Sequence, residues 1–146
     1  MKLSTKGRYG VRLMVDLALH NGERPVLLKD IARRQGISEK YLWNLINPLK
    51  TFGFVQSIRG AHGGYKLAKD PSEISVKDIM QVLEGPLCLV DCVESPESCE
   101  RSPSCITRDV WCEASQSFLK TLEAMTLEKM VERHRIKGSG AAEYCI

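Results

Sequence analysis

Two apolar stripes at helical spacing lie on either side of Gly36 in residues 27–52, and this feature constrains the fold most. The first stripe is Leu28, Ile31 and Ala32, and the second is Leu42, Leu45 and Ile46. Gly36 can take the left-handed conformation of a tight turn, and Ser38 is suited to cap the helix that follows. Pro48 removes a helical hydrogen bond, so we expect the second helix to kink or end near Asn47. This spacing is typical of a helix-turn-helix.

A β-hairpin is predicted directly after this pair of helices. Residues 54–58 and 65–67 are strand-like, and the glycine-rich stretch 59–64 predicts the turn between them. A hairpin in this place is a wing, and a wing beside a recognition helix is a familiar way to dock on duplex DNA. A glycine loop that cradles a nucleotide phosphate is the alternative, but no helix is predicted to begin after Gly64.

The rest of the chain is predicted to be helical around one loop. Ser4 is suited to cap a first helix that ends near His20, and apolar residues at 74–83 predict a short helix that ends at Gly85. The expected fold class is mainly α, with a winged helix-turn-helix DNA-binding domain and a long C-terminal dimerisation helix. The expected divisions are a DNA-binding domain at 1–70, a connecting helix at 71–85, a cysteine-rich loop at 86–105, dimerisation helices at 106–131 and a flexible tail at 132–146.

The long helix is expected at roughly 106–125. Residues recur along it at a spacing near 3.5 to form one seam: Trp111, Ser115, Phe118, Leu122 and Met125. Such a seam is suited to pairing with a second copy of the same helix, which predicts a homodimer. The alternative is a seam that is buried against its own domain. Thr126 is suited to cap a final short helix through Val131, and residues 137–142 have the composition of a flexible linker.

Composition and charge set the functional class. With 146 residues, 43% of them hydrophobic and 27% charged, the chain resembles an ordinary globular protein. No apolar run approaches a membrane span and no signal peptide is apparent, so we expect a cytoplasmic protein with no membrane partner.

The charge is divided unevenly between the two halves of the chain. Residues 1–70 carry 13 Lys and Arg against 5 Asp and Glu, whereas residues 71–146 carry 8 Lys and Arg against 13 Asp and Glu. The basic half predicts a surface that approaches phosphate, and a merely solvated basic face is the alternative.

Six cysteines lie at positions 88, 92, 99, 105, 112 and 145. Because a reducing cytosol disfavours disulfides, clustered thiols indicate metal or redox chemistry. Cys92, Cys99 and Cys105 lie in a loop with few apolar residues, where three thiolates can wrap a soft metal centre. Their wide spacing suits an iron–sulfur cluster better than zinc, and unligated redox-active thiols are the alternative. A thiol-based redox enzyme is disfavoured because no Cys-x-x-Cys is present, and we expect no catalytic residues.

Several motifs together resemble a known bacterial family. They are LSTKGRYG at 3–10, ISEKYL at 37–42, SIRG at 57–60, GGYKL at 63–67, VLEGP at 82–86 and TL at 126–127. The sequence is similar to the winged-helix regulators that include the iron–sulfur assembly repressor IscR and the cysteine-metabolism repressor CymR. The resemblance implies a homodimeric repressor that binds double-stranded operator DNA, with the long helices crossed or exchanged between subunits.

The same resemblance implies a cofactor. In cluster-binding members three cysteines before the long helix ligate iron, and the matching positions are Cys92, Cys99 and Cys105, which implies a cluster of the 2Fe–2S type. IscR-type members place a histidine where this chain has Arg108, which is a poor ligand because it stays protonated. The fourth ligand is left open between Cys88, Cys112, a residue of the partner subunit and an exogenous thiol. Ligation is expected to order the loop and to shift the placement of the two DNA-binding heads.

The predicted DNA contacts lie in three places. The start of the second helix is expected to face base edges, the wing to lie in or near the minor groove, and the N-terminal segment to lie near phosphates. The residues are Ser38, Glu39, Lys40, Tyr41 and Asn44; Arg59, His62 and Tyr65; and Lys2, Lys6 and Arg8. For His62 a plain turn residue is an equal alternative. Many relatives carry Glu-Gln where this chain has Trp43-Asn44, so their operator preference is not transferred.

The chain ends in Glu-Tyr-Cys-Ile after the linker. CymR-like members end in a similar tail, whose terminal isoleucine docks in the active site of O-acetylserine sulfhydrylase. Tyr144 and Ile146 are therefore the candidate contacts with such a partner enzyme, since a free carboxylate on an apolar residue suits a backbone nest. A chain end without a partner is the alternative.

Overall fold

The computed structural model of the chain describes residues 2–22 and 24–139. Its helices are α1 Thr5–Leu19, α2 Leu28–Gln35, α3 Glu39–Thr51, α4 Val76–Glu84, α5 Asp91–Glu94, α6 Ile106–Ala124 and α7 Leu127–Gly138. The strands are β1 Val55–Ile58 and β2 Gly64–Leu67, and short 3₁₀ turns lie at Pro71–Glu73, Pro96–Ser98 and Ser102–Ser104. The prediction of a mainly α chain with a helix-turn-helix and a hairpin is confirmed.

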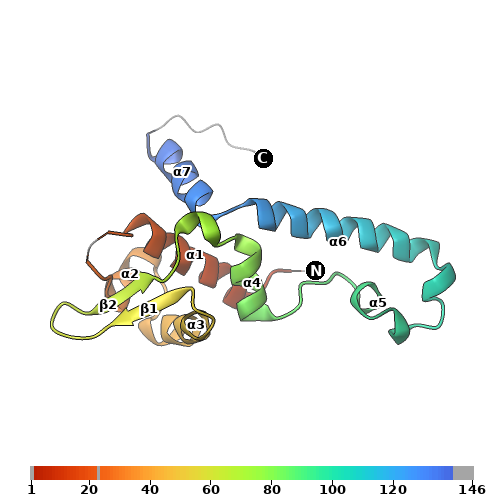
Figure 1. Cartoon of the computed structure of the whole chain (residues 1–146), viewed down its shortest axis with the longest axis horizontal. Coiled ribbons are helices and arrows are strands. Elements are labelled where there is room, and N and C mark those ends of the chain that lie inside the picture. Colours follow the sequence, from red (N-terminus) through yellow and green to blue (C-terminus); the bar gives the residue numbers. More distant parts are fainter. Residues whose placement is uncertain (1, 23, 140–146) are drawn as a thin grey trace.

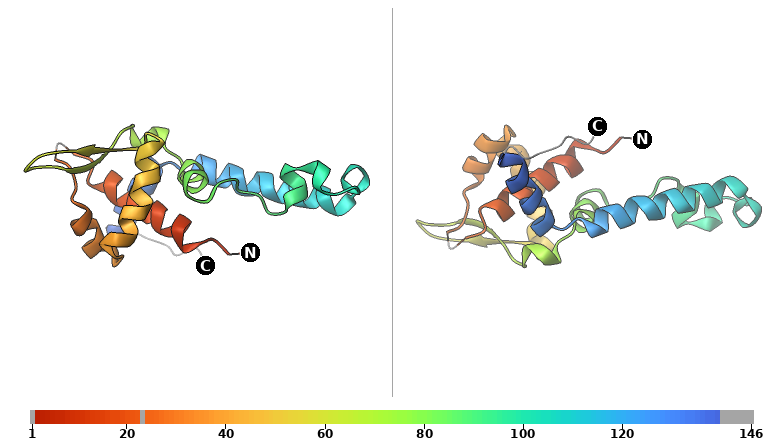
Figure 2. Two further views of the ribbon diagram at one scale, coloured as in Figure 1. Left: turned by 90° about the horizontal axis from the view of Figure 1, so that it is seen from below. Right: turned by 90° about the horizontal axis from the view of Figure 1, so that it is seen from above.

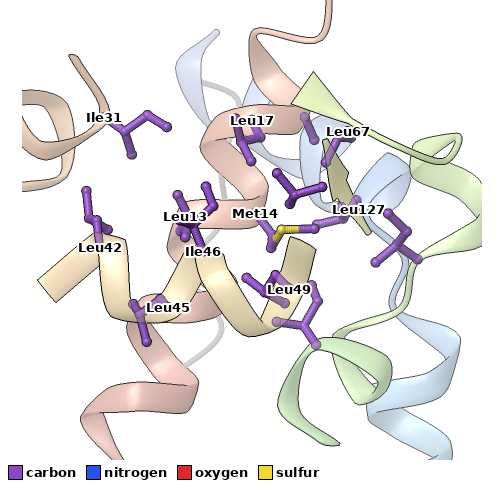
Figure 3. Packing of buried hydrophobic residues seen from close by; sticks show 14 of the residues in the cluster. Leu13, Met14, Leu17, Ile31, Leu42, Leu45, Ile46, Leu49, Leu67 and Leu127 are labelled. Atoms are coloured by element: carbon purple, nitrogen blue, oxygen red, sulfur yellow. The ribbon is translucent and has the colours of Figure 1, made fainter. Parts of the chain in front are cut away.

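Helices α1, α3, α4 and α7 pack with α2 and the hairpin into one head (Figure 1). Its core consists of aliphatic side chains that are almost fully buried (Figure 3). Among them are Leu13, Met14, Leu17, Ile31, Leu42, Leu45, Ile46, Leu49 and Leu127. Leu127 begins α7, so the last helix returns to the head that the first helix started. Burial of these side chains is the main force that holds the recognition helix α3 in place.

Local signals set the helix boundaries as predicted. The Ser4 hydroxyl accepts a hydrogen bond from the Gly7 amide at 3.1 Å, and the Ser38 hydroxyl accepts one from the Tyr41 amide at 3.1 Å. Gly36 ends α2 with φ 64°, the left-handed conformation that favours glycine. These three residues therefore define the start of α1 and the turn between α2 and α3.

Two helices extend past their predicted ends. At Pro48 a kink or an end near Asn47 was expected, and the end is wrong: helix α3 continues to Thr51, because Leu49 is fully buried and its packing outweighs the missing proline hydrogen bond. Helix α7 continues past Val131 to Gly138, so residues 132–138 of the expected flexible tail are helical. Arg135 and Lys137 lie in its last turn, where positive charge is favourable at a helix C-terminus.

The hairpin is antiparallel, with Val55 opposite Leu67 and Ser57 opposite Tyr65. An isolated bridge adds a third extended segment: Val26 and Tyr65 exchange two backbone hydrogen bonds of 2.8 Å each. Gly64 has φ 152°, and a side chain there would meet the Val26 carbonyl oxygen at 2.6 Å. Glycine at this position therefore lets the wing lie close to the segment that precedes α2.

Helix α6 forms a long arm that joins the head at its C-terminal end, and the cysteine-rich segment with α5 runs outward along it (Figures 1 and 2). The hairpin lies at the opposite end of the longest axis (Figure 1). Two backbone hydrogen bonds fix the base of the arm, from the Val76 amide to the Met125 carbonyl at 2.8 Å and from the Leu127 amide to the Ile74 carbonyl at 2.9 Å. Within the described ranges, no helix combines the length and the apolar character that crossing a membrane requires.

Candidate functional site

Helix α3 presents a polar face opposite its buried face. Glu39, Lys40 and Asn44 are exposed, whereas Tyr41 is half-buried. The tryptophan between them, Trp43, is 50% exposed, which is unusual for so large an apolar side chain. The predicted residues therefore share one accessible surface, and Trp43 belongs to it as well. Sequence reasoning left Trp43 out of the site, although position 43 lies outside the apolar stripe of Leu42, Leu45 and Ile46.

Basic side chains of α1 gather beside the start of α3. The rings of Tyr9 and Tyr41 meet edge to face at 5.9 Å, which joins the two helices. The guanidinium groups of Arg8 and Arg12 lie 5.9 and 5.2 Å from the centre of the Tyr9 ring. Arg12 also donates a hydrogen bond to the Gln35 side chain at 3.1 Å. Arg12 is thus a second residue of this surface that the sequence did not single out.

The remaining predicted contacts lie at the N-terminus and in the wing. Lys2 and Lys6 are exposed near the start of α1. Arg59 and His62 are exposed in the turn of the hairpin. Tyr65, in contrast, is half-buried at the base of the wing and packs against the core, and burial raises its pKa. Of the predicted DNA-contact residues outside the N-terminus, those at the tip of the wing and on the polar face of α3 are therefore the exposed ones.

A buried carboxylate fixes α2 against α1. Asp16 is 1% exposed; it accepts hydrogen bonds from Arg34 at 2.6 and 3.1 Å and from Gln35 at 2.8 Å. Burial by itself would raise the pKa of Asp16, but the hydrogen bonds and positive charge of its partners hold it below the ordinary value. Helix α2 supports α3, so this network positions the recognition helix. No local sequence pattern predicts this network.

The three candidate metal ligands lie in separate short elements. Cys92 is in α5, Cys99 follows the turn Pro96–Ser98, and Cys105 is the N-terminal cap residue of α6. Cys99 is exposed and the other two are half-buried. In the part of the chain that the structure describes, no three His, Cys, Asp or Glu side chains come together to hold a metal ion. The structure therefore does not gather these thiols into a ligand set.

The cysteine-rich segment nevertheless forms hydrogen bonds with the first turn of α6. The Arg108 guanidinium donates a hydrogen bond to the Cys92 carbonyl at 2.9 Å. The Cys105 sulfur lies 3.2 Å from the Thr107 hydroxyl, and this hydrogen bond, with backbone amides of the first turn, lowers the pKa of the Cys105 thiol. Burial and the carboxylates of Glu94 and Asp91 raise the pKa of the Cys88 thiol. The thiols thus differ in how readily each becomes a thiolate.

The predicted seam of α6 is covered unevenly: Trp111 is 43% exposed, whereas Phe118, Leu122 and Met125 are half-buried. Ile106 and Val110, which were not part of that seam, are 81% and 54% exposed. Ser115, which was predicted to belong to the same seam, is only 4% exposed because it faces its own chain. Ile106, Val110 and Trp111 thus expose apolar surface within the first two turns of α6. Tyr144 and Ile146, the candidate contacts with a partner enzyme, lie outside the described residues.

Comparison with known proteins identifies the family to which this chain belongs. The sequence model of the Rrf2 family, described as an iron-dependent transcriptional regulator, matches residues 3–133. The chain is 44% identical to the Rrf2 protein of Nitratidesulfovibrio vulgaris over 90% of its own length and 87% of that protein. The solved structure of CymR, the global cysteine regulator of Bacillus subtilis, is 41% identical with a TM-score of 0.79, covering 91% of this chain and 98% of that one.

The solved structure of IscR from T. potens is also similar, at 45% identity and a TM-score of 0.76, with 92% of this chain and 88% of that chain covered. These relatives are transcriptional regulators and not enzymes. The helix-turn-helix, the wing and the long C-terminal helix are therefore parts of a DNA-binding regulator, and the chain belongs to the Rrf2 family of winged-helix transcriptional regulators.

Proposed function

We propose that this chain is a homodimeric repressor of iron–sulfur assembly or sulfur-metabolism genes that senses iron–sulfur status or redox state through residues 86–105. The observation that carries the proposal is the attachment of the thiol segment to α6. Cys105 occupies the N-cap position of that helix, and Arg108 of its first turn donates a hydrogen bond to the backbone of Cys92. A change at the thiols therefore acts directly on the helix that leads into the DNA-binding head.

The DNA-binding surface combines α3 with its flanks. Glu39, Lys40, Tyr41 and Asn44 are proposed to face base edges, with Ser38 at the start of the helix. The wing residues Arg59 and His62, with Tyr65 at their base, are proposed to reach the minor groove. Lys2, Lys6 and Arg8 are proposed to lie near phosphates. The support is that most of these side chains are exposed and that α1 meets the start of α3 through the rings of Tyr9 and Tyr41.

Dimerisation is proposed to use the exposed patch at the start of α6. Ile106, Val110 and Trp111 are the most exposed apolar residues of that helix. Covering them with the same helix of a second copy would remove apolar surface from water, which favours association. Two heads would then be held together, as a palindromic operator requires.

The sensing step is proposed to be a shift between two arrangements of the thiol segment. Cys92, Cys99 and Cys105 provide the soft donors that an iron–sulfur cluster prefers, but the described structure keeps them in separate elements. Bringing three sulfurs together would require residues 91–105 to rearrange. The hydrogen bond from Arg108 to the Cys92 carbonyl belongs to the arrangement that the structure describes. Losing it would release the first turn of α6 from its contact with the thiol segment.

The test is an anaerobic reconstitution with iron and sulfide, followed by the visible absorption spectrum and an iron and sulfide assay. We expect colour and bound iron in the wild type, and loss of both in Cys92→Ala, Cys99→Ala and Cys105→Ala. Cys145→Ala, which removes the one cysteine that is not a candidate ligand, is the matched control and should keep the cluster. Operator affinity of loaded and unloaded protein is compared at the same salt concentration. Iron-free wild-type protein, or equal affinity of the two forms, would reject the sensing proposal.

The second candidate is a cluster-free repressor that O-acetylserine sulfhydrylase controls by docking on Ile146. The similarity to CymR, together with the Tyr144-Cys145-Ile146 ending, favours it. Deleting residues 143–146 should abolish binding of the enzyme in a pull-down with purified proteins, while operator binding by the regulator alone is retained. Unchanged enzyme binding after the deletion removes this candidate.

A further inference from the structure

Trp43 is an exposed tryptophan near the start of α3 that the DNA contacts proposed above leave without a role. It lies outside the stripe of buried residues Leu42, Leu45 and Ile46, and it is 50% exposed. A single exposed apolar residue is common on a protein surface. Trp43 differs because the N-terminal part of a recognition helix is the part that contacts base edges. Its position therefore indicates a contact with a base.

The charge near this tryptophan is predominantly positive. Helix α3 carries Lys40 and Lys50, both exposed, against one acidic residue, Glu39. The first half of α1, which meets α3 through two tyrosine rings, adds Arg8 and Arg12 and no acidic residue. Such a surface attracts a polyanion. Duplex DNA is thus the partner that the charge around the indole ring favours.

The chemistry of the indole ring narrows the choice of base. The major groove of duplex DNA presents hydrogen-bond donors and acceptors and one apolar group, the C5 methyl group of thymine. Placing an apolar ring over donors and acceptors would remove them from water without a replacement, which costs free energy. The indole N–H can only donate, and thymine carries the acceptor O4 next to its methyl group. Thymine therefore matches both the apolar and the polar part of the side chain.

We propose that Trp43 is a specificity-determining residue that recognises a thymine in the major groove, with its ring against the C5 methyl group and its N–H toward O4. The proposal rests on the proposed role of α3 in base recognition. It adds the base that one position of each operator half-site must carry. It does not depend on the thiols or on a bound cluster.

The first test removes one methyl group from the DNA and leaves the protein unchanged. Operators are selected in vitro with the full-length wild type and with Trp43→Ala, and we expect a thymine in each half-site that only the wild type requires. Deoxyuridine at that position should weaken wild-type binding about fourfold, as expected for one buried methyl group. The same replacement should leave the affinity of Trp43→Ala unchanged. Fluorescence anisotropy at a fixed salt concentration measures these affinities.

Three variants locate the effect on the protein. Trp43→Ala should weaken binding to the wild-type operator about tenfold, with little change on random DNA. Trp43→Phe keeps an apolar ring and should keep the preference for thymine over uracil. Phe52→Ala is the matched control, because it removes an exposed aromatic side chain at the other end of α3. It should bind both DNAs as the wild type does.

Two outcomes overturn the proposal: equal wild-type affinity for the thymine and uracil operators, or an equal loss on operator and random DNA in Trp43→Ala, as a backbone contact would give. Asn44→Ala separates this failure from a failure of the proposed function. If Asn44→Ala weakens operator binding while uracil has no effect, only thymine recognition by Trp43 is wrong. If neither Asn44→Ala nor Trp43→Ala weakens operator binding, α3 does not contact bases and both proposals are wrong.

Discussion

The guanidinium of Arg34 lies 2.6 Å from the carboxylate of Asp16, although the two residues are 18 positions apart and belong to different helices. Asp16 is almost completely buried, whereas Arg34 is about one-third exposed. Gln35 adds a further hydrogen bond of 2.8 Å to the same carboxylate. This contact holds α2 against α1, so the DNA-reading helix that packs on both depends on it.

Replacing the carboxylate should therefore destabilise the fold. Asp16→Asn keeps the volume but removes the charge, and we expect a loss of about 2 kcal/mol, since a buried ion pair is broken while Arg34 retains some contact with water. Urea unfolding followed by circular dichroism measures it. Asp30→Asn is the control: its exposed pair with Arg33, at 3.3 Å, should contribute less than about 0.5 kcal/mol. Equal effects of the two variants would contradict the assigned role.

The lowered pKa of Asp16 predicts how the stability of the fold changes in acid. The pKa of Asp16 in the folded chain lies below its ordinary value of 3.8, because hydrogen bonds and positive charge outweigh burial. A lowered carboxyl pKa stabilises the fold above the ordinary value, and this contribution is lost as the pH falls through the folded value. The stability gap between wild type and Asp16→Asn should thus shrink as the pH falls below about 4. A gap that widens below about pH 4 would contradict this sign.

The sequence predicts the features that depend on neighbours in the chain. Ser4, Gly36 and Ser38 act within one helical turn, so their roles as cap or turn residues could be predicted from local patterns. The Asp16 network could not, because it exists only once α1 and α2 cross. The continuation of α3 through Pro48 likewise depends on tertiary packing, in which Leu49 is buried by other elements.

The residues of the candidate site likewise separate into those that local patterns predict and those that depend on the rest of the fold. The exposed face of α3 follows from the spacing of its buried residues, so most DNA-contact candidates are exposed, and their contacts with DNA stay a prediction. The thiols were recognised by residue type, but their relative positions depend on the turns at Pro96–Ser98 and Ser102–Ser104, for which the sequence offers no periodicity. Ser115 was grouped with the dimer seam because spacing along a helix does not show which neighbour covers each face.

DNA recognition should separate into base and phosphate contacts. Asn44→Ala removes an amide that can pair with a base edge, so we expect a loss of about 1–3 kcal/mol on an operator found by in vitro selection and little change on random DNA. Lys6→Ala should weaken binding to both DNAs alike and reduce the salt slope by about 1. Fluorescence anisotropy at several salt concentrations measures both effects. An equal loss on both DNAs for Asn44→Ala would exclude base reading by this residue.

Dimerisation should depend on the exposed patch of α6. Val110 is 54% exposed on the chain by itself, so Val110→Glu should fold normally yet place a charge in the middle of the proposed interface. We expect monomers in sedimentation-velocity experiments at concentrations where the wild type is dimeric, together with at least tenfold weaker operator binding, because a single head makes half the contacts. Gln116→Glu adds the same charge at another exposed position of α6 and serves as the control. If Val110→Glu stays dimeric, the two copies associate through a different surface.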